Sequence, residues 1–224
     1  MRRLAWMGLF SCIALFSVGC GGSAAGADAM VRFLQASPDA PLVNVLVDGT
    51  SVAGNLAYGN ASGYISVKAG SRHIQVVPAS GSTPIFDQTI SFTSSTNQTL
   101  LLTGPAASIQ SVLLKDGGTT ATTGDGYVRV VNASGAMGAA DVYIVPAGVS
   151  IVGVKPIAAG LAFDKDTGYQ LTVAGNYEVF MTTPKTASAL LSTGSISLTS
   201  AQNQTVVALD GTSGGFMYAL LTDQ

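Results

Sequence analysis

Short apolar segments alternate with turn residues along almost the whole chain. The segments are rich in Val, Ile, Leu, Thr and Tyr, and residues such as Gly, Pro, Asn, Asp and Ser separate them. This pattern is typical of an all-β protein. In the first half of the chain it predicts strands at 31–36, 42–48, 63–68, 72–78, 86–93, 98–103 and 109–115. No segment has the length and 3.6-residue periodicity of a long amphipathic helix.

The second half of the chain repeats the first half. The matches include Val31-Arg32 with Val128-Arg129, Ala36-Ser37 with Ala133-Ser134, Gly63-Tyr64 with Gly168-Tyr169, and Asn97-Gln98-Thr99 with Asn203-Gln204-Thr205. The spacing between matched residues grows by a few residues along the chain, which indicates one loop that is longer in the second copy. A tandem pair of related domains explains this pattern.

The size of each copy suggests a particular architecture. About seven strands in roughly ninety residues is the size of an immunoglobulin-like sandwich. We therefore expect two tandem immunoglobulin-like antiparallel β-sandwich domains, at 30–116 and 127–224. The segment 117–126 between them is rich in Gly and Thr and has no apolar anchor, so it is predicted to be a linker. The sequence does not specify how the two domains pack on each other.

The N-terminus has the features of a targeting signal. Arg2 and Arg3 precede an apolar stretch at 6–18, which is too short to span a bilayer comfortably, and Gly19-Cys20 follows. This arrangement resembles a bacterial lipoprotein signal, in which a peptidase cuts before a cysteine that carries diacylglycerol. The resemblance implies a signal peptide at 1–19 and lipidation of Cys20.

Two cysteines limit the covalent chemistry of the chain. Ser17 departs from the lipoprotein pattern, which prefers Leu or another aliphatic residue there, so ordinary secretion with an incidental cysteine is the alternative. Cys12 is the only other cysteine and leaves with the signal peptide, so the mature chain forms no internal disulfide. Residues 20–29 are mostly small and are expected to form a flexible lipidated tether.

A lipid at Cys20 would hold the protein on a membrane of the cell envelope. Gly21 is not the aspartate that typically marks inner-membrane retention, so the outer membrane is expected if the cell has two membranes.

Ten basic and twelve acidic residues are scattered along the chain and give a formal net charge of −2. Nothing resembles a nucleic-acid footprint, so the expected partners are the membrane and envelope proteins or polysaccharide.

Several motifs resemble one known family, the domain of unknown function 4397. They are the opening Val31-Arg32-Phe33-Leu34-Gln35-Ala36-Ser37-Pro38-Asp39-Ala40-Pro41, then Asn44-Val45-Leu46-Val47-Asp48-Gly49, and later Tyr58-Gly59, Gly63-Tyr64 and Ala69-Gly70. The second copy departs from the pattern, because Gly135-Ala136-Met137-Gly138 replaces the Pro-Asp-Ala-Pro turn. Family members often carry histidine where Gln35 and Asn132 stand. The resemblance implies a bacterial envelope or secreted protein, often with tandem copies, and no established activity.

The residues offer little catalytic chemistry. His73 is the only histidine, and its repeat partner is Glu178, which predicts that both lie on the outward face of a strand. One histidine supports no Ser-His-Asp triad without geometry, and a zinc site would have to use carboxylates. We therefore expect no enzyme activity, no catalytic residues, no resident metal and no cofactor.

Some acidic residues permit two interpretations. Asp164-Lys165-Asp166-Thr167-Gly168 resembles the start of a calcium loop, but the twelfth position of an EF-hand would be Gly175, so only a looser site stays open. The alternative is that these charges solvate the loop that is longer in the second copy. Asp39 either faces a ligand from a loop or caps its own turn, and Asp48-Gly49 is predicted to close a hairpin.

The repeated polar residues also have more than one interpretation. Arg32 and Arg129 could each pair with a nearby carboxylate, although the sequence does not choose which one. The two Asn-Gln-Thr tripeptides fit the eukaryotic glycosylation pattern, but in a bacterial lipoprotein they indicate a polar turn before a buried strand.

Together these features predict a non-catalytic, lipid-anchored envelope protein that acts as a binding or structural module. One alternative is a glycan-binding protein, which would need a row of exposed aromatic residues. The candidates are Tyr58, Tyr64, Tyr127, Tyr143, Tyr169, Tyr177 and Tyr218. A second alternative is a hydrolase, which would need a pair of carboxylates in a cleft.

Overall fold

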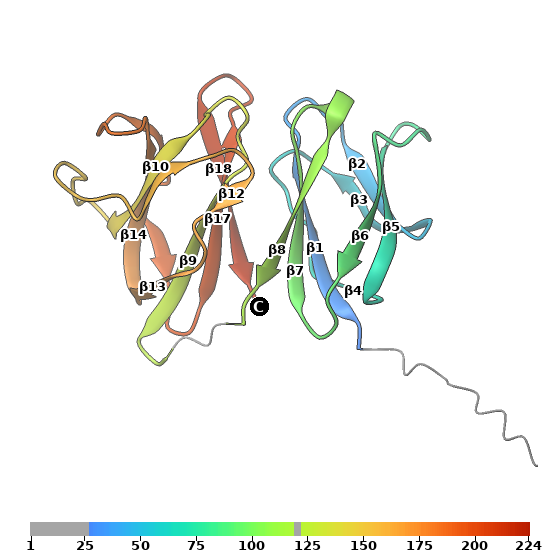
Figure 1. Cartoon of the computed structure of the whole chain (residues 1–224), viewed down its shortest axis with the longest axis horizontal. Coiled ribbons are helices and arrows are strands. Elements are labelled where there is room, and N and C mark those ends of the chain that lie inside the picture. Colours follow the sequence, from blue (N-terminus) through green and yellow to red (C-terminus); the bar gives the residue numbers. More distant parts are fainter. Residues whose placement is uncertain (1–26, 119–121) are drawn as a thin grey trace, which may run out of the picture.

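The computed structural model of the chain describes residues 27–118 and 122–224, and these form two β-sandwiches side by side (Figure 1). The predicted signal peptide (1–19), Cys20 and most of the predicted tether (20–29) lie outside the described residues. The first sandwich contains β1 (Ala29–Ala36), β2 (Val43–Val47), β3 (Thr50–Leu56), β4 (Ile65–Val67), β5 (Gly70–Pro78), β6 (Phe86–Phe92), β7 (Asn97–Thr103) and β8 (Gln110–Asp116).

The second sandwich follows the same order but has two strands more, because β12 and β13 stand where the first has β4, and β15 and β16 where it has β6. It contains β9 (Asp125–Asn132), β10 (Ala140–Pro146), β11 (Ala158–Leu161), β12 (Lys165–Asp166), β13 (Gln170–Val173), β14 (Gly175–Thr182), β15 (Ala189–Ser192), β16 (Ile196–Leu198), β17 (Asn203–Asp210) and β18 (Phe216–Asp223). The expected all-β class and the sandwich architecture are confirmed. In the described part of the chain, no helix is long and apolar enough to cross a membrane.

Each domain has one inner sheet, next to the other domain, and one outer sheet. The inner sheet of the first domain has the order β4-β1-β7-β8, and that of the second has the order β12-β9-β17-β18. In the second, β13 also pairs with β9, beside β12. The outer sheets are β3-β2-β5-β6 and β11-β10-β14-β15, with β16 also on β14. Pairing is antiparallel except that β1 pairs with β7 and β9 pairs with β17 in parallel.

The central strands of the inner sheets, β1, β7, β9 and β17, are buried on both faces. In β1, Val31 and Phe33 point into the core of the first sandwich, whereas Leu34 and Ala36 belong to a separate apolar cluster. That cluster joins the two inner sheets. Its buried members are Leu34, Ala36, Leu101, Leu114, Val131, Ala133, Val207, Leu209, Ala219 and Leu221. The two domains therefore share a core, in addition to the core that each encloses by itself.

All seven strands predicted in the first copy are present, with ends that differ by a residue or two. The prediction missed β3, Thr50–Leu56. This strand lies at the edge of the outer sheet and includes Gly54 and Asn55, so its sequence has neither the apolar alternation nor the β-branched content of a typical strand. The predicted hairpin at Asp48-Gly49 is confirmed, because both residues have positive φ (49° and 79°) and connect β2 directly to β3.

The sequence predicts that the longer loop of the second copy contains 164–168, and this prediction is wrong. That segment matches the first copy residue by residue, because Asp164 N donates to Asn132 O as Gly59 N donates to Gln35 O. The added residues lie between β10 and β11, where the first copy has only Asp48-Gly49. The matched motifs flank a wide interval, so their spacing could not locate the insertion within it.

Candidate functional site at the domain interface

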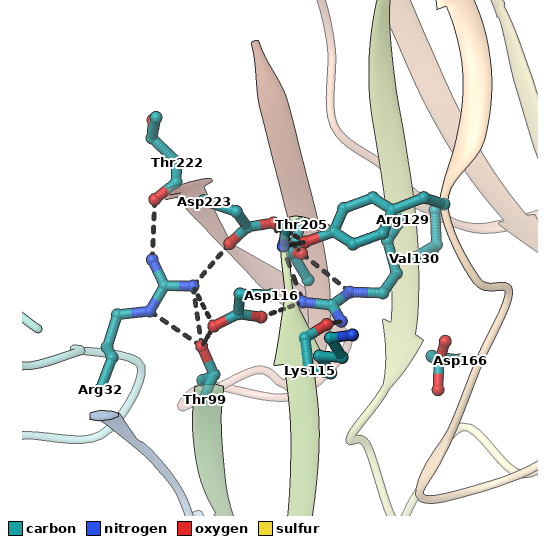
Figure 2. Close-up of polar contacts among 12 residues, drawn as sticks. Arg32, Thr99, Lys115, Asp116, Arg129, Val130, Asp166, Thr205, Thr222 and Asp223 are labelled. Carbon is teal, nitrogen blue, oxygen red and sulfur yellow. Dashed lines mark hydrogen bonds and ion pairs between the residues drawn. The ribbon is translucent and has the colours of Figure 1, made fainter. Parts of the chain in front are cut away.

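Arg32 lies on the face of β1 that points toward the second domain, and its side chain is only 6% exposed. Its Nε and Nη2 donate to Thr99 Oγ1 at 3.0 and 2.8 Å, and its Nη1 donates to the backbone carbonyl of Thr222 at 2.9 Å. Nη2 also contacts Asp223 Oδ1 at 2.6 Å (Figure 2). The guanidinium of the first domain is therefore paired with a carboxylate of the second domain.

Arg129 on β9 makes the equivalent contacts in the opposite direction. Its Nε donates to Thr205 Oγ1 at 3.0 Å, and its Nη1 donates to the carbonyl of Lys115 at 2.9 Å. Nη2 contacts Asp116 Oδ1 at 2.5 Å. The two ion pairs cross the interface, because each arginine reaches the end of the last inner strand of the other domain.

The four charges form one buried cluster, which we call the crossed network (Arg32, Asp116, Arg129 and Asp223). Arg32 also lies 3.6 Å from Asp116, and Arg129 lies 3.8 Å from Asp223. Both aspartate side chains are fully buried. Two positive and two negative charges balance, as the burial of ionised groups requires.

Two tyrosines complete the crossed network. The guanidinium of Arg32 lies 4.7 Å from the ring centre of Tyr64, whose hydroxyl donates to Asp116 Oδ2 at 2.8 Å. Tyr169 repeats this arrangement with Arg129 at 4.5 Å and Asp223 at 2.7 Å. Thr99 and Thr205 also donate to these aspartates, so each carboxylate accepts hydrogen bonds on both oxygens.

The environment shifts the acid–base behaviour of these groups. Burial raises the pKa of the Tyr64 and Tyr169 hydroxyls, and the adjacent carboxylates raise it further. Burial alone lowers the pKa of Arg129, but Tyr169, Asp116 and Asp223 outweigh that effect and raise it overall. The tyrosines therefore stay neutral and the arginine stays charged, which keeps every donor in place at neutral pH.

This arrangement is suited to holding two domains in one orientation. The donors and acceptors of the crossed network bond to one another, and its carboxylates are enclosed, so it presents no open position to a substrate. A buried ion pair adds little net stability, because desolvation offsets much of the attraction. We therefore assign the crossed network a positioning role at the interface.

The sequence pointed to the arginines but not to their partners. The repeated Asn-Gln-Thr tripeptide was interpreted as a polar turn, yet Thr99 and Thr205 lie inside β7 and β17 and are fully buried. A usable signal was present, because Arg, Gly-Tyr, Thr and a final Asp recur in both copies. Asp116 directly precedes the expected linker, so its position in the sequence does not mark it as part of a strand that contacts the second domain.

The positions of Gln35 and Asn132, where histidine is common in the family, have a local structural role. Both are buried at the ends of β1 and β9. Gln35 Oε1 accepts from Ser37 N at 2.6 Å, and Asn132 Oδ1 accepts from Ser134 N at 3.2 Å. They fix the start of the loop that follows each first strand.

At the other end of the inner sheets, loops of both domains enclose a pocket of about 220 Å³, which we call the loop-end pocket. Its lining residues are Pro38, Asp39, Gly104, Pro105, Ala133, Gly135, Ala136 and Asp210. Asp39 Oδ1 accepts from the backbone N–H of Ala106 at 2.7 Å, so Asp39 links its own loop to the one after β7. This bond differs from the predicted cap, because it reaches a loop 67 residues away and not the turn that contains Asp39.

The remaining candidate residues lie apart from both sites. His73 is on the surface of the outer sheet, as predicted, where its Nε2 lies 2.5 Å from Asp87 Oδ1. Asp164 Oδ2 accepts from Thr103 Oγ1 of the first domain at 3.1 Å, and burial raises the pKa of Asp164. Within 27–118 and 122–224, no three or more His, Cys, Asp and Glu side chains lie together as a metal site would need.

The tyrosines do not form an exposed row in the described structure. All seven are buried or half-buried. Five of their hydroxyls donate to protein acceptors, namely those of Tyr58, Tyr64, Tyr169, Tyr177 and Tyr218. For Tyr58, burial raises the pKa to about 12. The aromatic platform that a glycan-binding surface would use therefore gains no support from these residues.

A high-pH titration should reveal the buried tyrosines. Stability from Tyr64 and Tyr169 is complete below a pH of about 10, the ordinary tyrosine pKa. Because their folded pKa is raised, that stability is lost as pH rises through the folded values. In a pH titration, tyrosinate absorbance is recorded together with thermal unfolding at each pH. We expect one fraction of the tyrosines to ionise only at the pH where the protein unfolds. Ionisation of all tyrosines near pH 10 in an intact fold would contradict this.

These observations define a class of protein, a tandem β-sandwich whose two copies are joined face to face by a shared core and crossed ion pairs. The chain belongs to the family described as Domain of unknown function (DUF4397), whose model matches residues 29–143. The match includes the whole first domain and extends through β9 into β10 of the second. It confirms the resemblance seen in the motifs.

Other comparisons add little. No curated protein sequence matches the chain. A crystal structure from Bacteroides fragilis, of a protein named as a candidate for cell adhesion, covers 89% of this chain and 98% of that chain at 10% identity, with a TM-score of 0.24. At that score the likeness supports no argument about this protein.

Proposed function

We propose that this protein is a lipid-anchored, non-catalytic module of the cell envelope, and that its two sandwiches act as one rigid unit that binds another envelope component. The observation that carries the proposal is the interface itself. Domains within a chain move relative to each other unless their interface is large and hydrophobic. Here ten buried apolar residues and the crossed network join the two copies.

A fixed orientation has a functional consequence. Loops from two rigidly joined domains can form one composite binding surface, whereas loops on freely moving domains cannot keep a common geometry. The loop-end pocket is such a composite, because each domain supplies half of its lining. A rigid pair on a lipid tether suits a protein that presents a surface to partners outside the membrane.

Capture of the partner tests this proposal. The lipidated full chain is crosslinked in cells, purified, and analysed by quantitative mass spectrometry together with the attached polysaccharide. We expect a saturable envelope partner. Attachment of nothing above background would overturn the binding role, and release of soluble products from envelope polysaccharide by the purified protein would establish a hydrolase instead.

A further inference from the structure

The loop-end pocket lies at the end of the first sandwich that is opposite to the start of β1. β1 begins at Ala29, next to the N-terminal segment, and the loop that contains Asp39 follows its last residue (Figure 1). A strand of eight residues extends roughly 25 Å at about 3.3 Å per residue. The pocket therefore lies at the opposite end of β1 from Ala29.

The lining of the pocket combines apolar walls with two acidic side chains. Prolines, alanines and glycines form the walls, and Asp39 and Asp210 supply its only polar side chains. A volume of about 220 Å³ is below the roughly 300–1,000 Å³ of pockets that enclose a whole small molecule. The space therefore suits a single side chain of a larger partner.

Backbone hydrogen bonds hold both carboxylates in place. Asp210 Oδ1 accepts from Ala136 N at 3.2 Å and from the Ser134 hydroxyl, while Asp39 Oδ1 accepts from Ala106 N. In the part of the chain that the structure describes, neither carboxylate has a Lys, Arg or His within salt-bridge distance. Two oriented negative charges thus share one pocket without a cation from this chain.

The two copies carry their acid at different positions of the paired loops. The residue equivalent to Asp210 in the first copy is Gly104, and the residue equivalent to Asp39 in the second copy is Ala136. Each copy forms its sandwich without the acid of the other. The repeats therefore differ where their loops meet, and the result is one carboxylate from each domain.

We propose that the loop-end pocket binds a basic side chain, lysine or arginine, presented by a partner protein. The aliphatic stem would pack against the proline and alanine walls, as such stems do on apolar surfaces. The charged end would lie between Asp39 and Asp210, whose carboxylates can accept charge-assisted hydrogen bonds from an ammonium or guanidinium group. This assignment rests on the proposed binding function and specifies its chemistry.

Small-molecule titration of the full chain, purified in detergent, tests the assignment directly. The probe is N-acetyl-lysine methylamide, and the matched control is its uncharged norleucine analogue. NMR shifts of the Ala106 and Ala136 amides, which bond to the two carboxylates, report on occupancy. We expect a saturable, salt-sensitive shift with the lysine probe and at least a tenfold weaker response with the analogue.

Variants complete the test. The double variant Asp39→Asn/Asp210→Asn should abolish the response to lysine, whereas Asp87→Asn, on the outer sheet, should leave it unchanged. Thermal unfolding checks that the double variant folds. Ala136→Leu, which adds bulk at an exposed lining position, provides a second route to the same loss. Equal binding of the analogue, retention of lysine binding in the variants, or Ca²⁺ binding in competition with lysine would overturn the assignment.

The two proposals fail in different ways. A partner captured in cells without any lysine binding in the pocket would leave the binding module standing and reject the pocket assignment. Lysine binding without a cellular partner would support the pocket and reject the proposed function.

Discussion

Replacing Arg129 with methionine is expected to lower the free energy of unfolding by about 3–5 kcal/mol, because the change leaves a buried carboxylate without its charge partner. Asp116 has a fully buried side chain and contacts Arg129 at 2.5 Å. Arg32 lies 3.6 Å from the same carboxylate but is bonded to Asp223, so it compensates only in part. Chemical denaturation of the purified variant and the natural chain measures this loss.

A second substitution separates lost charge balance from lost packing. Adding Asp116→Asn to Arg129→Met removes the unpaired charge, and we expect it to restore much of the lost stability. Arg32→Met is the matched control on the other side of the interface and should behave like Arg129→Met. A loss below about 1 kcal/mol for both single variants would show that the crossed network is solvated like a surface ion pair.

Changing Cys20 to serine is expected to move the protein from the membrane fraction to the soluble envelope fraction. The proposed thioether would need the cysteine sulfur, and a folded sandwich domain without a lipid has no comparable membrane affinity. Fractionation of cells and labelling with a fatty-acid analogue measure the effect. Cys12→Ser is the matched control and should leave both readouts unchanged. Membrane retention of the Cys20 variant would contradict lipid anchoring.

Most of the strands could be predicted from the sequence, because each strand has its own local pattern of apolar and turn residues. Apolar periodicity and turn residues predicted every strand of the first copy except β3, whose exposed edge position leaves little apolar pattern. The Asp48-Gly49 hairpin followed from turn chemistry alone. The location of the inserted loop did not follow, because the repeat motifs only flank the interval that contains it.

The interface was harder to predict, because it depends on contacts between distant residues. One signal was present in the continuous apolar run at Leu100-Leu101-Leu102, which indicates a strand buried on both faces. A sandwich that exposed one inner face would alternate there. The pairing of Arg32 with Asp223 required the relative placement of two domains, which no local pattern encodes.

The central claim, that the two domains form one rigid unit, is tested most directly by a distance measurement between them. A chain beginning at Ala27 contains no native cysteine, so spin labels can be placed at Thr89→Cys on β6 and Ser197→Cys on β16. Both positions are exposed on the outer sheets. Pulsed electron paramagnetic resonance should give one narrow distance distribution. A broad distribution, typical of independent domains on a flexible linker, would contradict the claim.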